Sequence, residues 1–344
     1  MTRAAIIAGR GDVFTNFLFV DSFKKIWKDE VDMLYVAIAS YFDEEHKKFL
    51  RDVVFNDPKI KLFFFDRITE GGDNEPFLIE QSKEDHLVML EDDVLVFKKL
   101  ALDEYFKKIE NGEFDVIGPY SPALSTWIRE KAKAMYGYDA VGPSHRFMKR
   151  SDWEKTDKIY KANSFGIGEY KREVDMIMPD RTRGISRGDT GMWNSVELMH
   201  AGCRIGYINE VRATAIRPGV PWTHVNSLSG FSNSCFPNLN TMDYVGKMTD
   251  IKPFTLEKLK KDAVMKSSIY GKSTPEAKSA SDNEHCRILS WIGIAMKKYW
   301  DLLSPIDKYR ETYKKGYEWW LDASSCPRDL LEQYIKKHEA YITW

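Results

Sequence analysis

The sequence has few cysteines, no excess charge of either sign and no long apolar run. Its four cysteines are widely spaced without a CxxC pair, which argues against a zinc ribbon or dense disulfide scaffold and favours a reducing compartment. With 51 Lys and Arg against 52 Asp and Glu, a nucleic-acid partner would need a local basic patch. The apolar start is too short for a signal peptide or anchor, so we expect a cytoplasmic chain without membrane insertion.

What is present is an ordinary globular composition, 43% hydrophobic and 30% charged over 344 residues, enough for about two domains. In the first half, short apolar runs alternate with amphipathic stretches, which predicts an α/β fold with a sheet flanked by helices. We expect strands at 4–8, 33–39, 60–65, 86–90, 94–97, 115–118 and 204–208, and helices near 17–27, 43–54, 75–83, 103–111 and 190–201. Glycine and proline are frequent over 119–188, which favours loops and short elements there.

The last part of the chain has a different, mostly helical pattern. We therefore expect a catalytic or binding domain at 1–250 and a helical accessory region at 251–344. Trp291, Ile294 and Lys298 recur at helical spacing, which favours a packed helical core over a sugar-stacking surface. This region contains lysine pairs at 260–261, 297–298, 314–315 and 336–337. Such pairs are typical of the solvent-exposed faces of amphipathic helices, and they could also form a basic face that binds a polyanion.

Three adjacent carboxylates, Glu91, Asp92 and Asp93, stand between two apolar runs. Like charges so close repel and raise one another's pKa values, and a divalent cation removes that cost. Carboxylate oxygens suit Mg²⁺ or Mn²⁺, which often bridge protein and nucleotide phosphates. The alternative is a solvated acidic turn. Because the cluster follows a predicted strand, at the end where open α/β sheets bind ligands, the metal site is favoured.

The segment Leu-Val-Met-Leu-Glu-Asp-Asp-Val-Leu-Val-Phe at 87–97 resembles the DxD region of nucleotide-sugar glycosyltransferases with the GT-A fold, in a Glu-Asp-Asp variant. A second block is similar to that family: an acidic residue opens a helix at 188–193, and Ala-Gly and a strand follow at 201–207. The resemblance spans about residues 4–226 in element order. It implies a GT-A-like, Rossmann-type mixed sheet flanked by helices, with a helical C-terminal region that has no counterpart in the family.

The resemblance also implies roles for individual residues. Asp93 would bind the metal directly and His224 would complete its site. Glu91 and Asp92 would act nearby, one of them holding the ribose or a metal-bound water. Asp189 would contact the acceptor and act as general base in an inverting reaction. Structural roles remain as alternatives. Asp189 is also well suited to cap a helix, and His224 could be a loop histidine that binds no metal.

The donor nucleotide would bind after the first strand, at Ala8, Gly9 and Arg10, with Asp66 accepting from base or ribose. Asp66 equally suits the cap of a turn, and no GxGxxG or GxxxxGK[ST] phosphate loop is present. Other basic residues suit either an anionic ligand or plain solvation: Arg181, Arg183, Arg187, His145, Arg146 and Lys149.

The resulting prediction is a Mn²⁺- or Mg²⁺-dependent hexosyl- or pentosyltransferase, with a UDP-sugar as the favoured donor. The acceptor is a glycan or, by analogy with enzymes of this fold that modify viral DNA or viral glycans, a hydroxymethylated base in DNA. Two other classes remain: a nucleotidyltransferase acting on sugar phosphates, and a noncatalytic protein that binds carbohydrate or nucleic acid.

Overall fold

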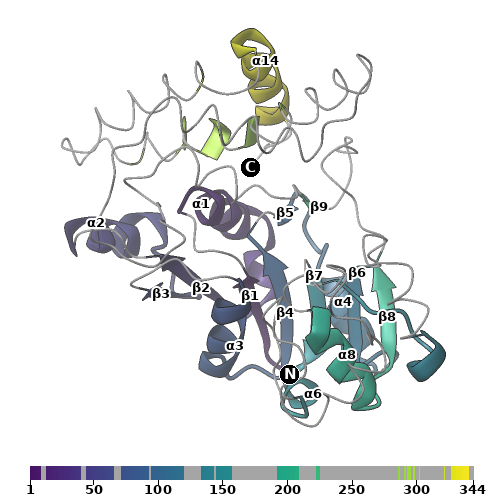
Figure 1. The fold of residues 1–344 in the computed structure, drawn as a ribbon. Helices are drawn as coiled ribbons and strands as arrows, with labels where there is room; N and C mark the ends of the chain where they lie inside the picture. The colour runs from purple at the N-terminus through teal and green to yellow at the C-terminus, as the bar shows by residue number, and fades with distance from the viewer. Residues whose placement is uncertain are drawn as a thin grey trace, which may run out of the picture.

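The computed structural model describes residues 1–8, 13–39, 44–65, 71–92, 94–119, 133–142, 145–156, 192–208, 222–224 and 327–340, and scattered positions from 286 to 321. These residues form a seven-stranded sheet, in the order β3-β2-β1-β4-β7-β6-β8, and a two-stranded sheet of β5 and β9. Helices cover the large sheet (Figure 1). The expected α/β class with a mixed sheet flanked by helices is therefore confirmed.

Six strands of the large sheet run in one direction and β7 runs against them. The strands are β1 (Arg3–Ala8), β2 (Met33–Ala39), β3 (Ile60–Phe65), β4 (His86–Glu91), β6 (Val116–Pro119), β7 (His145–Lys149) and β8 (Ile205–Ile208). The small sheet pairs β5 (Val94–Val96) with β9 (Trp222–His224). We call the edge where the six parallel strands end the carboxyl edge, and the opposite one the amino edge.

The sequence prediction failed at β7, which belongs to the sheet although loops and short elements over one face were expected there. Its sequence, His-Arg-Phe-Met-Lys, has too few apolar residues to predict a buried strand. Nevertheless His145 and Arg146 are 1% and 0% exposed, and β7 lies between β4 and β6. The reason is tertiary: a strand in the middle of a sheet is buried on both faces whatever its composition.

The helices of the first 250 residues occupy the expected places to within a few residues, apart from the short helix α6, and α14 lies near the end of the chain. They are α1 (Val13–Ser22), continued by η1 (Phe23–Trp27) and η2 (Lys28–Glu30), α2 (Glu44–Phe49) with η3 (Leu50–Val54), α3 (Gly71–Gln81), α4 (Asp103–Glu110), α6 (Arg150–Trp153), α8 (Met192–His200) and α14 (Arg328–Glu339). Gly112 and Gly202, which follow α4 and α8, have φ of 70° and 82°. This left-handed conformation favours glycine and ends both helices where the sequence predicts.

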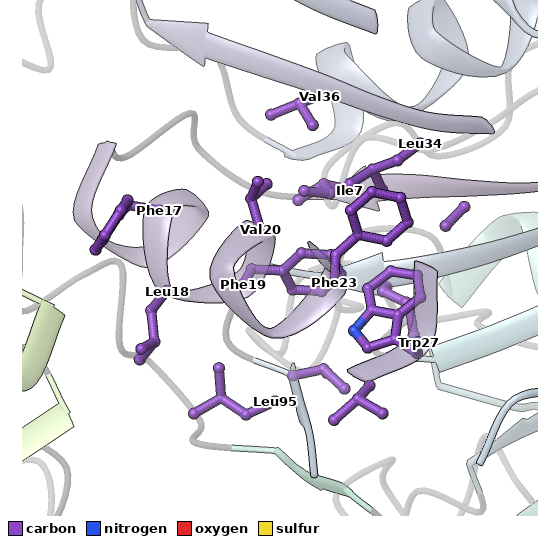
Figure 2. Packing of buried hydrophobic residues seen from close by; sticks show 14 of the residues in the cluster. Ile7, Phe17, Leu18, Phe19, Val20, Phe23, Trp27, Leu34, Val36 and Leu95 are labelled. Carbon is purple, nitrogen blue, oxygen red and sulfur yellow. The ribbon is translucent and has the colours of Figure 1, made fainter. Parts of the chain in front are cut away.

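One face of the sheet is covered by α1 and η1, which supply a cluster of aromatic side chains. Figure 2 shows Phe19 and Phe23 between the strands and Trp27. The Trp27 ring packs edge-on against both, with centroids 5.4 Å from Phe19 and 4.8 Å from Phe23. Such contacts add to the stabilisation from apolar burial. The other face packs against α3 and α8 through Leu78, Ile79, Val196 and Leu198 among others.

The described part of the C-terminal region packs against the first face. Trp291 is fully buried and its ring centroid lies 5.9 Å from that of Phe97, which follows β5. Lys298 Nζ lies 2.9 Å from Asp21 Oδ2 of α1. Figure 1 shows α14 beyond α1 and β5. The packed-core interpretation of Trp291 is confirmed, whereas α14 was not expected, and the boundary near residue 250 lies outside the described residues.

The cysteines differ from the simplest expectation. Cys203 is a buried free thiol, and burial raises its pKa to about 12, so it stays protonated. Cys286, also buried, is disulfide-bonded. A disulfide is typical of oxidising compartments, so this feature does not support the reducing compartment expected from cysteine spacing. Among the described residues, no helix is both long and apolar enough to cross a membrane.

Candidate active site at the carboxyl edge

The order of the strands reverses between β1 and β4. The chain builds β1, β2 and β3 outward on one side and then returns to place β4 on the other side of β1. Open α/β sheets bind ligands outside the carboxyl ends of their strands at such a switch point. The register pairs Ala8 with Glu91, so the last residues of β1 and β4 lie side by side there.

The acidic motif begins at this point. Leu87 to Leu90 are fully buried, and the chain passes directly from them to Glu91, which is half-buried, and Asp92, which is 3% exposed. Strand β5 starts at Val94, so the motif fills the short connection between the two sheets. Asp93 itself lies outside the described residues. Two neighbouring carboxylates at the end of a buried strand are the arrangement that the sequence predicts.

The small sheet brings a distant segment to the motif. Strand β9 runs antiparallel to β5, and its last residue, His224, pairs with Val94. The backbone of His224 is therefore opposite the residue that follows Asp93, although the two are far apart in the sequence. The structure describes the backbone of His224 but not its side chain, so its role as a metal ligand stays a prediction.

Strand β7 adds two basic residues that the sequence left undecided. His145 pairs with Leu90 and Arg146 with Met89, so both lie beside the end of β4. Arg146 Nη2 lies 3.7 Å from Met89 Sδ, and alternation along β4 puts Glu91 on the same face as Met89. The solvated alternative is wrong for these two residues, because both are buried. Their signal in the sequence was weak, since a buried arginine is rare and composition favours exposure.

The remaining expected site residues are not placed. Gly9, Arg10, Asp66 and Asp189 lie outside the described residues; Ala8 is placed by its backbone, at the end of β1. Their described neighbours are well anchored, since β3 ends at Phe65 beside Ala39 of β2. Within the described ranges, no group of three or more His, Cys, Asp and Glu side chains is close enough to hold a metal ion.

The helix expected to start near Asp189 is held by buried polar contacts to the segments around Val141 and Thr156. Strand β8 follows this helix, α8, as the sequence predicts. Asn194 Nδ2 donates to Thr156 Oγ1 at 3.1 Å and to Glu197 Oε2 at 3.0 Å. Ser195 Oγ accepts from the backbone N–H of Val141 at 3.0 Å. Paired polar groups of this kind fix the position of a buried helix.

No protein-family model matches the chain, and no curated protein matches its sequence. Several solved structures are similar to this chain, among them the following three. The galactosyltransferase LgtC is 12% identical, with a TM-score of 0.41 over 65% of this chain and 86% of that one. TarS 1-349 from S. aureus is 10% identical, with a TM-score of 0.38 over 98% and 92%. The mannosyltransferase PcManGT from Pyrobaculum calidifontis, solved with GDP-Man and Mn²⁺, is 9% identical, with a TM-score of 0.40 over 99% and 87%. These values are too low to assign an activity to the chain.

Proposed function

We propose that the chain is a metal-dependent glycosyltransferase that moves a sugar from a nucleotide-sugar, preferably a UDP-sugar, to an acceptor hydroxyl. The observation that carries the proposal is the register of the strands at the carboxyl edge. It places Ala8 beside Glu91 and the backbone of His224 opposite Val94, so both flank the acidic motif. The resemblance to GT-A glycosyltransferases implies that these segments form one site.

The residues around the motif fit a divalent cation. Carboxylate oxygens and a neutral imidazole form a donor set that suits Mn²⁺, and carboxylates with phosphates suit Mg²⁺. Asp93 and His224 would hold the ion, with Glu91 and Asp92 beside it. A bound divalent ion offsets negative charge on the diphosphate of the donor. The chain's own contribution is to hold several carboxylates at the end of a rigid buried strand, where they would otherwise repel one another.

The donor would lie across the switch point. Gly9 and Arg10 follow β1, and Asp66 follows β3, so all three continue from strands that end at the carboxyl edge. We propose that the backbone at Gly9 approaches the nucleotide, that Arg10 pairs with phosphate, and that Asp66 accepts from base or ribose.

The acceptor hydroxyl needs a base to take its proton as the new glycosidic bond forms. We assign this role to Asp189, and we propose that the reaction inverts the anomeric configuration. A glycan acceptor is favoured over a hydroxymethylated base in DNA. Lys297 and Lys298, from the candidate basic face, are ion-paired with Glu339 and Asp21, so these lysines are already balanced by carboxylates.

Calorimetric titration tests the proposal directly. UDP and GDP are titrated into the protein with Mn²⁺ and then with a chelator, for wild type, Asp93→Ala and Asp52→Ala. Asp52 of η3 is an exposed acid paired with Lys48 of α2, and serves as the matched control. We expect chelator-sensitive binding that only Asp93→Ala removes. Absence of binding by every nucleotide would refute the proposal and favour a noncatalytic binding protein.

Product analysis separates the remaining enzyme class. A glycosyltransferase releases UDP from a UDP-sugar, whereas a nucleotidyltransferase acting on a sugar phosphate and UTP releases pyrophosphate. Incubation with UDP-glucose, UDP-galactose or UDP-N-acetylglucosamine, followed by NMR of the anomeric proton, also tests the stereochemistry. Retention of the donor's configuration would exclude Asp189 as the base of a single displacement.

A further inference from the structure

We propose a second binding site, specific for a phosphate group, at the amino edge of the sheet. A cavity of about 370 Å³ lies there, at the start of β4, the end of β7 and the first turn of α6. Strand β4 separates it from the acidic motif, because His86 and Glu91 are its first and last residues. At about 3.3 Å per residue the two sites are some 17 Å apart, so this site is independent of the proposed glycosyl transfer.

Two basic side chains face one another across the strands at this cavity. The register pairs His86 with Lys149, and directly opposite residues of antiparallel strands have side chains on the same face, about 5 Å apart. His86 is 6% exposed, and its Nδ1 has no hydrogen-bond partner in the described part of the chain. Burial, together with the charge of Lys149 and Arg3, lowers the pKa of His86 against the opposing effect of Glu110 and Asp85. An anion bound here would balance the charge of Lys149 and could accept a hydrogen bond from the imidazole.

Two of the three carboxylates that line the cavity are already occupied, and the third, Glu154, is 57% exposed to solvent and lies 3.7 Å from Arg150 Nη1. Both oxygens of Glu110 accept from Arg3, through Nε and Nη2, each at 2.7 Å. Asp85 Oδ2 accepts from the backbone N–H of Thr2 at 3.0 Å and from its hydroxyl at 3.2 Å. Carboxylates held in this way are poorly available to a ligand, and their charge is largely balanced by the groups that bind them.

The donors of the cavity have spare capacity. The Lys149 ammonium has three N–H groups. Its one ion pair within the described part of the chain is a long contact of 3.6 Å to Asp115, whose oxygens are also bound by Arg204. Ser151 is exposed on α6, and no hydrogen bond of its hydroxyl is found among the described residues. Arg150 donates from Nε and Nη2 to carbonyl and hydroxyl oxygens near the end of α3, and its Nη1 lies 3.7 Å from Glu154, its one contact with a residue that the structure describes.

An excess of available donors over available acceptors fits an oxyanion. The tetrahedral phosphate group offers several acceptor oxygens to an ammonium, a hydroxyl, an imidazole and a guanidinium at once. The cavity volume is near the lower end of the range for small-molecule pockets, which suits a phosphorylated metabolite rather than a polymer. The ligand is therefore inorganic phosphate or the phosphate group of a small metabolite.

Thermal-shift and calorimetric titrations in chloride buffer of constant ionic strength test the site. The probes are sodium phosphate, glucose 6-phosphate and glucose. The variants are Lys149→Met and Ser151→Ala, with Lys155→Met as matched control, because Lys155 is ion-paired with Asp152 and does not line the cavity. We expect saturable phosphate binding by wild type and by the control, at least tenfold weaker binding by Lys149→Met, a smaller loss in Ser151→Ala, and no response to glucose.

Tighter binding of glucose 6-phosphate than of phosphate would identify a metabolite as the ligand, and equal binding would identify inorganic phosphate. The proposal fails if wild type binds neither phosphate probe, or if both cavity variants bind as well as wild type. Circular dichroism checks that the variants fold, and Ser151→Ala is the safer test because it removes an exposed hydroxyl. The chelator and Asp93→Ala should leave phosphate binding unchanged, so failure here is distinguishable from failure of the proposed glycosyl transfer.

Discussion

Charged side chains are arranged differently at the amino and carboxyl edges of the sheet. At the amino edge, carboxylates alternate with donors: Arg3 binds Glu110 and Asp103, and Arg204 binds Asp115. At the carboxyl edge, carboxylates follow one another along the chain, from Glu91 onward.

The difference separates charges that hold the fold from charges arranged for a ligand. Matched ion pairs satisfy one another and contribute to stability, if modestly when exposed. Adjacent carboxylates cost stability, and in the proposed site a bound cation offsets that cost. Removing a carboxylate of the acidic motif should therefore damage function, whereas removing a member of a matched ion pair at the amino edge should reduce stability.

The largest effect is expected for Asp93→Asn at the carboxyl edge. Loss of a proposed metal ligand should lower the rate of UDP release from a UDP-sugar by more than about a hundredfold. The melting temperature in chelator should not fall, because the substitution removes one of several repelling charges. A variant with unchanged activity, or one that fails to fold, would break the comparison.

The next largest effect is expected for Arg3→Ala at the amino edge. Its guanidinium is 18% exposed, binds two carboxylates and stacks over the Phe106 ring at 4.9 Å. Leaving both acids without their partner should lower the free energy of unfolding by about 2 kcal/mol, measured by urea denaturation. Nucleotide binding by the folded variant should be unchanged. Lys48→Ala, which breaks an exposed pair with Asp52, is the control and should leave stability unchanged.

Glu30→Gln gives a pH-dependent test of the same edge. The buried carboxylate accepts backbone N–H groups from Leu100, Leu102 and Asp103 at 2.8 to 3.0 Å, yet burial raises its pKa above the ordinary value of 4.5. The folded state therefore binds the Glu30 proton more tightly than the unfolded state, and wild type loses this stability as the pH rises from 4.5 through the folded pKa. The stability of Glu30→Gln relative to wild type should rise over that window in urea titrations, and a constant difference would contradict the assignment.

The smallest effect is expected for Asp115→Asn. The Arg204 guanidinium lowers the pKa of Asp115 to about 2, so the pair stabilises the fold above pH 3.8 and is lost as the pH falls towards 2. Because Arg204 is half exposed, solvent screening keeps the contribution small. The variant should be slightly less stable than wild type at pH 7 and equal to it near pH 2. Added salt should shrink the difference at pH 7.

The sequence predicted the parallel part of the sheet well. Apolar runs mark its strands, and glycines mark the ends of its helices, so both features can be read from the local sequence. Strands β2 and β3 match the expected bounds, and α4 and α8 end at glycines. Strand β7 was missed because its burial comes from its neighbours and not from its own residues. The pairing of His224 with Val94 was equally invisible, since register between distant segments depends on the whole fold. The resemblance suggested His224, but only the sheet brings its backbone to the motif.

The pairing of β5 with β9 also has a consequence for synthesis on the ribosome. Strand β4, which leads into the acidic motif, leaves the exit tunnel early, together with β1 to β3. Strand β9 is made much later. At about 5 to 20 residues per second, several seconds separate the two. The nascent chain can therefore pair β1 to β4, with the acidic motif at the end of β4, before β9 has been synthesised. A chain released before residue 222 would keep the β1–β4 ladder but lack β9 beside its acidic motif.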